Sequence, residues 1–446
     1  LHNTLFPYTT LFRSILFSLA FLRETTCLKR MISNLSHSLA GSLTLLFLLA
    51  GLIGGLGSPQ KVRAQTFDLS GFVKSSYLYD TRQVVAARET EFMLYPAEDA
   101  DPGEEDASDT DRLASYQIFS RLGLTIGGVP QVLGADVQGY FESDFFGPTG
   151  LTTNTLRIRR AHVKMMWDDR EVLFGVEWSP LFTLAAFPRT IATEAGTPFN
   201  PFGRQPMVKL TLKRDNLRLI GAAAWQFDAF QSADFLGTSG IQQQQLSALP
   251  GLHGQVQYVA EDLTLGGGGY VKALRPVAAG ERVFTGAALA YAAYIGERFN
   301  VRGKAIYGGD LHDHVKTSGI IYDAAEDPEG NFVRDAYQAL NSFSTWLDVE
   351  GKGTVVPGLF AGYLTNLGAS DSVSDAVIAT GRGTNIDALW EIAPRVALNY
   401  GPMRFGFEVQ VTTAAYASDF DENYAPTGDT ESVTNVRGNV SVFLFF

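Results

Sequence analysis

The chain has 446 residues, a formal net charge of −12 and a single cysteine, Cys27. A chain this acidic lacks the basic face that nucleic-acid binding requires, and one cysteine permits neither an internal disulfide nor a cysteine metal cluster. We therefore expect no nucleic-acid partner, no cofactor and no bound metal.

The first 64 residues differ in character from the rest. Residues 1–30 precede the first methionine, Met31, and their opening resembles translated adapter DNA, so we expect them to be a non-native extension. The apolar run 43–56 and the small-residue pattern ending at Ala64 predict a secretory signal peptide over residues 31–64. A membrane anchor is the alternative, but a run of about 14 residues is short for a spanning helix, which needs about 20.

From residue 65 onward, apolar and polar residues alternate in segments that are each long enough for a membrane-crossing strand. Phe405, Phe407 and Val409 share one parity, for example, whereas Arg404 and Glu408 take the other. This two-residue period predicts strands with one apolar face. We expect sixteen strands, which begin near residues 66, 113, 134, 154, 171, 206, 217, 250, 263, 283, 299, 336, 354, 385, 402 and 433.

The connections between these segments alternate between long and short. The short ones include Asp168-Asp169-Arg170 and Gly401-Pro402. Transmembrane barrels have short periplasmic turns and longer external loops. We therefore expect residues 65–446 to be all-β, a transmembrane antiparallel β-barrel of about sixteen strands in a bacterial outer membrane. The expected long connections are 80–112, 146–153, 181–205, 230–249, 276–282, 311–335, 366–384 and 417–432.

The end of the sequence fits the same interpretation. Val440, Val442, Leu444 and Phe446 alternate on one face, and a terminal Phe on such a strand resembles the signal that the outer-membrane assembly machinery reads. A plain apolar strand is the alternative explanation. The expected surroundings are the lipid bilayer and lipopolysaccharide.

Motifs for bond chemistry are missing from the sequence. It has no G-x-S-x-G, H-E-x-x-H or phosphate-loop pattern, so we expect no enzyme. The run His312-Asp313-His314 could chelate a cation, but solvated loop residues are the favoured interpretation. The first long connection is strongly acidic, which would suit cation binding or a vestibule, yet a solvated loop is again favoured.

Basic residues concentrate between residues 154 and 214. If Ala161 and Val163 face lipid, then Arg160, His162 and Lys164 face the lumen, because Arg or Lys on the lipid face costs about 2–4 kcal/mol at the midplane. The strand after next repeats this parity and would place Lys209 and Lys213 inside. The apolar connection between them carries Arg189, Glu194 and Arg204.

Here the sequence resembles a family of known proteins. The stretch from Asp144-Phe145-Phe146 through Leu156–Ala161 to Leu173-Phe174-Gly175 is similar to the phosphate-selective porin O/P family and to DcaP-like porins. The resemblance implies a homotrimer, a third loop folded into the lumen and a preference for anions. It also marks Arg157, Arg159 and Arg160 as the basic residues of the motif strand.

These observations predict a passive outer-membrane porin for small hydrophilic solutes, with anions such as phosphate or carboxylates favoured at a basic constriction. The field of charges at a narrow point decides selectivity even in an acidic protein. The basic side is assigned to Arg160, Lys164, Lys209, Lys213, Arg189 and Arg204, and the opposing acidic side to Glu177 and Glu194.

Three rival functions remain open. A closed structural or adhesive barrel would show negligible conductance. An outer-membrane enzyme would need a Ser/His or Asp/His constellation. A fatty-acid or sugar channel would have another strand number and an aromatic lumen.

Overall fold

The computed structural model describes residues 65–446 except 101–104, 148–151, 228–229, 236, 279, 324–336 and 373–376. The expected extension (1–30) and signal peptide (31–64) lie outside the described residues and stay predictions. Within the described ranges, no helix combines the length and apolar character needed to cross a membrane.

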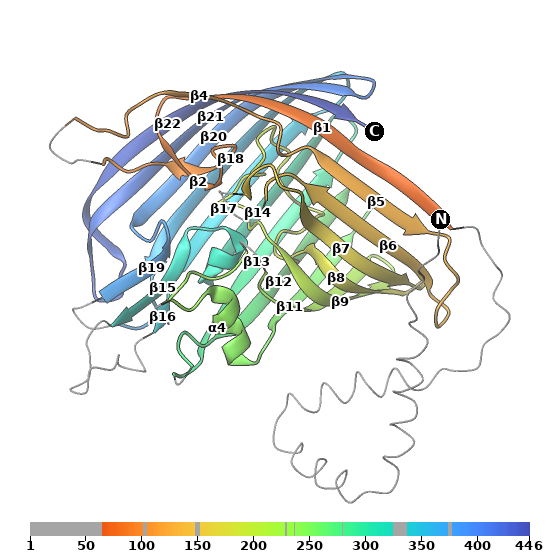
Figure 1. Ribbon diagram of the computed structural model, residues 1–446, viewed down its shortest axis with the longest axis horizontal. Coiled ribbons are helices and arrows are strands. Elements are labelled where there is room, and N and C mark those ends of the chain that lie inside the picture. The colour runs from red at the N-terminus through yellow and green to blue at the C-terminus, as the bar shows by residue number, and fades with distance from the viewer. Residues whose placement is uncertain are drawn as a thin grey trace, which may run out of the picture. The chain divides into compact units, whose positions relative to one another are not determined.

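The strands form a closed antiparallel β-barrel (Figure 1), as the alternation predicted. The first strand, β1 (Thr66–Asp80), pairs with the last, β22 (Pro426–Phe445), so that Phe72 stands opposite Phe445. Beyond this ladder, Gly71 and Phe446 exchange backbone hydrogen bonds of 3.0 and 3.1 Å. Because each strand is paired on both sides, the barrel exposes no unpaired edge to lipid.

The barrel has sixteen strand positions, as predicted. Two segments, β4 (Arg112–Tyr116) and β5 (Arg121–Gly127), share one position. β4 pairs with the C-terminal part of β1, and β5 pairs with its N-terminal part. The remaining strands are β6 (Asp136–Asp144), β7 (Arg157–Met166), β8 (Arg170–Trp178), β9 (Arg204–Arg214), β10 (Leu217–Ala224), β11 (Gly251–Val259), β12 (Leu263–Leu274), β13 (Val283–Ile295), β14 (Phe299–Gly309), β17 (Asn341–Gly351), β18 (Val355–Gly368), β20 (Ile386–Tyr400) and β21 (Met403–Phe420).

The two faces of the barrel reverse the pattern of a water-soluble protein. In β11, Leu252 and Val256 are more than half exposed, whereas His253, Gln255 and Gln257 are buried. An apolar exterior and a polar interior are the arrangement expected of a barrel surrounded by lipid.

Two strand positions depart from the sequence prediction. The twelfth strand was expected near residue 336 and begins at Asn341, and the last was expected near 433 and begins at Pro426. The predicted long connection over 417–432 is therefore wrong, because β21 and β22 continue past the barrel as a paired hairpin down to residues 421–425. A hairpin outside the membrane needs no apolar face, so the alternation that marks a barrel strand is lost there.

The long connections carry structure of their own. The first contains the hairpin β2 (Val84–Arg88) and β3 (Phe92–Pro96), and the fourth contains helix α4 (Gly240–Ser247), which Ser239 caps. Later connections supply the 3-10 helix η3 (Leu311–His314) and a small sheet of β16 (Gln338–Ala339), β15 (Ser318–Asp323) and β19 (Val377–Arg382).

The main apolar cluster of the described residues lies inside the barrel. It joins Phe92 of the first loop to Phe182 and Phe202 of the third loop (residues 179–203) and to the inward side chains Trp346 and Phe360. Loops that would be solvated outside a barrel are therefore folded into its interior, and they narrow the space through which a solute could pass.

Candidate functional site

The basic strand β7 carries three closely spaced arginines on the lumen side, Arg157, Arg159 and Arg160. A β-bulge opposite Glu142 and Ser143 interrupts the alternation, so that Arg160 pairs with Glu142 while Ile158 pairs with Ser143. Arg159 falls inside the bulge and is 1 % exposed. A bulge turns neighbouring side chains toward the same face, and both Arg159 and Arg160 therefore reach the interior.

Carboxylates of the neighbouring strands pair with these arginines. Arg159 Nε lies 2.8 Å from Glu142, a second nitrogen of Arg159 contacts Asp144, and Arg157 Nε lies 2.7 Å from Asp144. Arg160 lies 2.6 Å from Glu177 of β8. Inside a barrel wall such charges need partners, and the ladder of pairs fixes the orientation of each guanidinium.

The third loop is fastened to the lumen wall by buried charged side chains. Lys304 Nζ donates to the carbonyls of Leu181 and Phe182 at 2.9 and 2.7 Å. Glu408 accepts from the backbone N–H groups of Ile191 and Ala192 at 3.0 and 2.9 Å. These bonds to main-chain groups at the start and in the middle of the loop hold it across the interior.

Lys74 fastens the same loop from the first strand. Its Nζ donates to Thr193 Oγ1 at 2.7 Å and to the Ile191 carbonyl at 3.3 Å. The loop therefore crosses from β8 to the wall formed by β1 and β21, and it divides the interior.

A cavity of about 580 Å³ lies between the third loop and the barrel wall. Its lining includes Phe445 at the end of β22, Phe72 opposite it on β1, and Arg404 next to the turn Gly401-Pro402. The cavity therefore occupies the half of the interior nearer the short turns, where both termini of the barrel lie.

Cations dominate the lining of this cavity, which we call the basic vestibule. Only two carboxylates, Glu142 and Glu350, are among its residues. The basic side chains come from opposite walls and from the third loop, and they are Lys74, Arg121, Arg159, Arg160, Arg189, Arg302, Arg395 and Arg404.

The arginines of the vestibule differ in whether an acidic side chain among the described residues pairs with them. Arg302 and Arg395 contact Glu350 and Asp348 at 2.8 Å each. By contrast, neither Arg189 nor Arg404 forms an ion pair with any described residue: Arg189 lies 4.0 Å from the Phe187 ring, and Arg404 Nε donates to Asn399 at 2.8 Å. The vestibule therefore holds positive charge that the surrounding protein does not neutralise.

The structure brings some of the predicted basic residues into the vestibule and leaves others outside it. Arg160 and Arg189 line the vestibule. Lys164 and Lys213 instead surround Glu171, at 3.9 and 2.6 Å, and Lys209 has the same inward parity on β9. Arg204 is 2 % exposed and lies 4.8 Å from the rings of Trp178 and Phe230, outside the vestibule lining.

The two predicted acidic residues lie in different places. Glu177 belongs to the same wall as its partner Arg160, rather than facing it. Glu194 lies near the tip of the third loop, where it accepts from Gln410 at 2.6 Å. Burial raises the pKa of Glu194. Neither carboxylate lines the vestibule.

Several vestibule residues were not singled out from the sequence. Lys74 and Arg395 are the only basic residues of β1 and β20, and Arg302 shares β14 only with Lys304, so none shows the clustering that drew attention to β7. Their inward parity was the available signal. Each lies on the polar face of an alternating strand, where a basic side chain points to the lumen.

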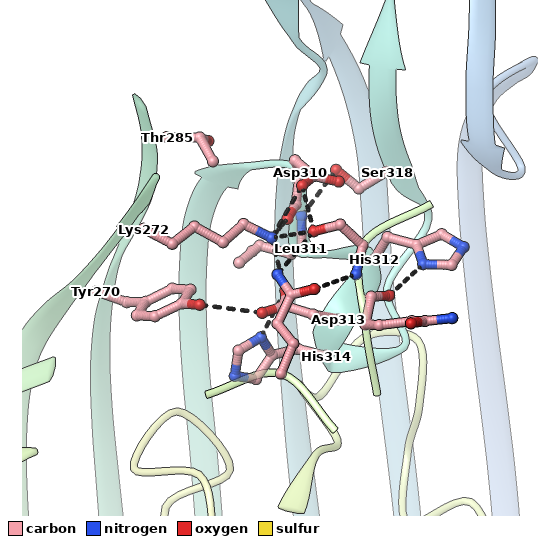
Figure 2. A network of polar contacts seen from close by, with 12 residues as sticks. Tyr270, Lys272, Thr285, Asp310, Leu311, His312, Asp313, His314 and Ser318 are labelled. Carbon is pink, nitrogen blue, oxygen red and sulfur yellow. Dashed lines mark hydrogen bonds and ion pairs between the residues drawn. The ribbon is translucent and has the colours of Figure 1, made fainter. Parts of the chain in front are cut away.

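A second set of charged side chains in the interior forms a buried network of ion pairs and hydrogen bonds around Lys272 (Figure 2). Lys272 Nζ lies 2.9 Å from Asp310 and 3.0 Å from Asp313, and Tyr270 donates to Asp313 at 3.0 Å. Burial works to raise the pKa of Asp313, but His314 and Lys272 outweigh it and hold that pKa well below its usual range. The network ties η3 to β12.

The same network does not have the geometry of a cation site. His312 Nδ1 donates to the Gln231 carbonyl at 2.8 Å, and burial lowers the pKa of His312 to about 3. Within the described ranges, no group of three or more His, Cys, Asp or Glu side chains could hold a metal ion. The run His312-Asp313-His314 thus serves contacts between loops.

One chain of contacts has the residue types of a hydrolase triad. Ser179 Oγ lies 2.8 Å from His314 Nε2, and His314 Nδ1 lies 3.0 Å from Asp313. Ser179 is 1 % exposed, and a nucleophile needs room for a substrate carbonyl at the hydroxyl. The enclosed hydroxyl supports a structural role, in which η3 anchors the start of the third loop.

Comparisons with known proteins agree with the fold. The outer membrane channel DcaP of Acinetobacter baumannii superimposes with a TM-score of 0.64 at 16 % identity, over 88 % of this chain and 100 % of that one. An anion-selective porin from Comamonas acidovorans gives 0.51 at 12 % identity, over 86 % and 100 %. A loop-deletion mutant of OmpT from Vibrio cholerae gives 0.51 at 9 % identity, over 86 % and 100 %.

At these identities the likeness defines the class of fold, a sixteen-stranded barrel of the outer-membrane porin type. No family model and no curated protein matches the sequence. The fold agrees with the expected resemblance to DcaP-like porins, whereas the resemblance to the phosphate-selective porin O/P family is not specifically shown and stays a prediction.

Proposed function

We propose that this chain is a passive porin of the bacterial outer membrane that admits small hydrophilic solutes and favours anions at the basic vestibule. The observation that carries the proposal is the lining of the vestibule, in which eight basic side chains meet two carboxylates. No bond chemistry is involved. The favoured anions are of the phosphate or carboxylate class, which guanidinium groups bind well.

Electrostatics supports this preference in spite of the acidic composition. Salt screens exposed charges, such as those of solvated external loops, over a Debye length of about 8 Å at physiological ionic strength. Charges inside a narrow passage with low-dielectric walls act on a solute directly. The unpaired Arg189 and Arg404 therefore count for more than the net charge of the chain.

Flux through reconstituted liposomes tests the proposal. Protein in liposomes should release trapped acetate or phosphate faster than the cations of similar size, and glucose should also leave without added energy. The double variant Arg189→Gln, Arg404→Gln should reduce the anion advantage. Faster release of cations, unchanged in that variant, would contradict the proposal.

A closed structural barrel is the second candidate, and one observation favours it. The apolar cluster of Phe92, Phe182, Phe202 and Phe360 crosses the interior. A closed barrel predicts negligible release of any trapped solute. The flux experiment therefore separates the two candidates directly.

Assembly partners belong to the proposal as well. A homotrimer follows from the resemblance to the porin families and stays a prediction, which sedimentation in detergent would test. The terminal Phe446 is proposed as the signal for the outer-membrane assembly machinery, since its backbone completes the pairing of β22 with β1. Lipid and lipopolysaccharide would surround the apolar exterior.

A further inference from the structure

The hairpin β2–β3 of the first loop is more deeply buried than a loop should be. The five residues of β3 are all buried, with Met93 and Leu94 each 1 % exposed. A hairpin of an external loop normally keeps one face in water. This hairpin instead lies within the barrel and belongs to its apolar cluster.

Glu91 joins the hairpin to both the wall and the third loop. Its carboxylate lies 3.5 Å from Lys74 Nζ and accepts from Ser76 and Thr193, each at 3.1 Å. Lys74 in turn binds the third loop at Thr193. One buried carboxylate thus couples β1, the hairpin and the third loop into a single unit.

The hairpin also lines a small cavity that shares residues with the basic vestibule. The Phe92 ring packs edge-on against Phe202 of the third loop, with centroids 5.0 Å apart. The adjoining cavity holds only about 40 Å³, against about 580 Å³ for the vestibule, and shares Phe119, Arg159 and Phe202 with it. Ala87, Arg88 and Phe92 of the hairpin region line this small cavity.

We propose that the β2–β3 hairpin, together with the third loop, sets the size limit of the channel. The inference rests on the proposed porin function and deepens it, because it assigns the constriction to the first loop as well as to the third. Phe92 supplies the obstructing side chain, and Glu91 holds the hairpin in place. The limit applies to neutral and charged solutes alike.

The base of the hairpin offers a clean place for a deletion. Ala97 N donates to the Gln83 carbonyl at 2.8 Å, and Gln83 N donates to the Ser108 carbonyl at 2.9 Å. Residues 83 and 97 therefore already face each other, and a Gly-Ser turn can replace residues 84–96 without changing a barrel strand. A matched control replaces the outer hairpin tip, residues 421–425, with an Asn-Gly turn.

The test is swelling of liposomes in neutral sugars of increasing size, from arabinose to raffinose. The deletion should admit larger sugars than the parent protein and raise single-channel conductance about twofold or more, whereas the control should match the parent. Heat-modifiable migration on gels confirms that each barrel has folded. An unchanged size limit and conductance in the folded deletion protein would overturn the proposal.

Point variants keep the proposal testable should the deletion fail to fold. Phe92→Ala should shift the size limit upward, and Glu91→Gln should do so to a smaller degree, while Phe284→Ala on the outer face, 65 % exposed, should not. Folded Phe92→Ala and Glu91→Gln proteins with the parent's limit would contradict the assignment. Because the sugars are neutral, this result is independent of whether the anion preference holds.

Discussion

The two charged regions of the interior, the Lys272 network and the basic vestibule, differ in how their charges are balanced. Lys272 and its partners Asp310 and Asp313 are fully buried and pair with one another. In the vestibule, Arg189 is exposed to the cavity and has no described acidic partner. The comparison teaches that matched, enclosed charges hold loops in place, whereas unmatched charges at an open cavity are available to a solute.

The largest expected effect comes from breaking the balanced network. Lys272→Met leaves Asp310 and Asp313 buried without their cation, and breaking one partner of a buried pair costs about 3–5 kcal/mol. We expect a lower midpoint of urea unfolding and a poorer yield of folded barrel. Gel migration after heating in urea measures both.

Lys213→Met is the matched control for that variant. The Lys213 side chain is 35 % exposed and its ammonium pairs with Glu171 at 2.6 Å, so its loss should change the midpoint little. Equal destabilisation by Lys272→Met and Lys213→Met would show that buried and partly exposed ion pairs contribute alike to stability, against this account.

The next effect should appear in selectivity rather than in stability. The double variant Arg189→Gln, Arg404→Gln removes the two vestibule cations that lack ion pairs, and the chloride-to-potassium permeability ratio should fall by about threefold. Reversal potentials in a salt gradient provide the ratio.

Arg204→Gln is the comparison for the double variant. Arg204 is enclosed by Trp178, Phe202 and Phe230 and does not line the vestibule. Its substitution should lower stability and leave the permeability ratio unchanged. A fall in the ratio with Arg204→Gln alone would place the selective charges elsewhere.

A smaller change of opposite sign is expected from Glu350. It lies 2.8 Å from Arg302 and is one of two carboxylates in the lining, so Glu350→Gln frees positive charge. The permeability ratio should rise, by less than about twofold because Asp348 still partners Arg302 and Arg395. A fall in the ratio would show that Glu350 acts by positioning Arg302.

The positions of the strands could be predicted from the sequence, and so could the side of the barrel, lumen or lipid, to which each side chain points. The inward parity of Arg160, Lys164 and Lys209 follows from the cost of charge in lipid, which acts locally and leaves a two-residue period. The start of β8, expected at 171 and observed at Arg170, shows how closely turn residues mark strand ends.

Features that depend on contacts between distant segments could not be read in this way. The bulge that turns Arg159 inward depends on the register between β6 and β7. The folding of β2–β3 into the interior depends on Thr193 and Phe202 of the third loop, which are distant in sequence. The sequence also favoured a solvated first loop, because its acidic part hides the apolar run of β3.

The reversal potential of the parent protein in a planar bilayer, with a tenfold potassium chloride gradient centred near 0.1 M, tests the central claim most directly. At this ionic strength screening leaves the vestibule charges effective over about 10 Å. We expect a reversal potential whose sign indicates preferential passage of chloride. Its magnitude should decrease as the salt concentration of both solutions is raised toward 1 M. A potential of the opposite sign, unaffected by Arg189→Gln and Arg404→Gln, would contradict the account.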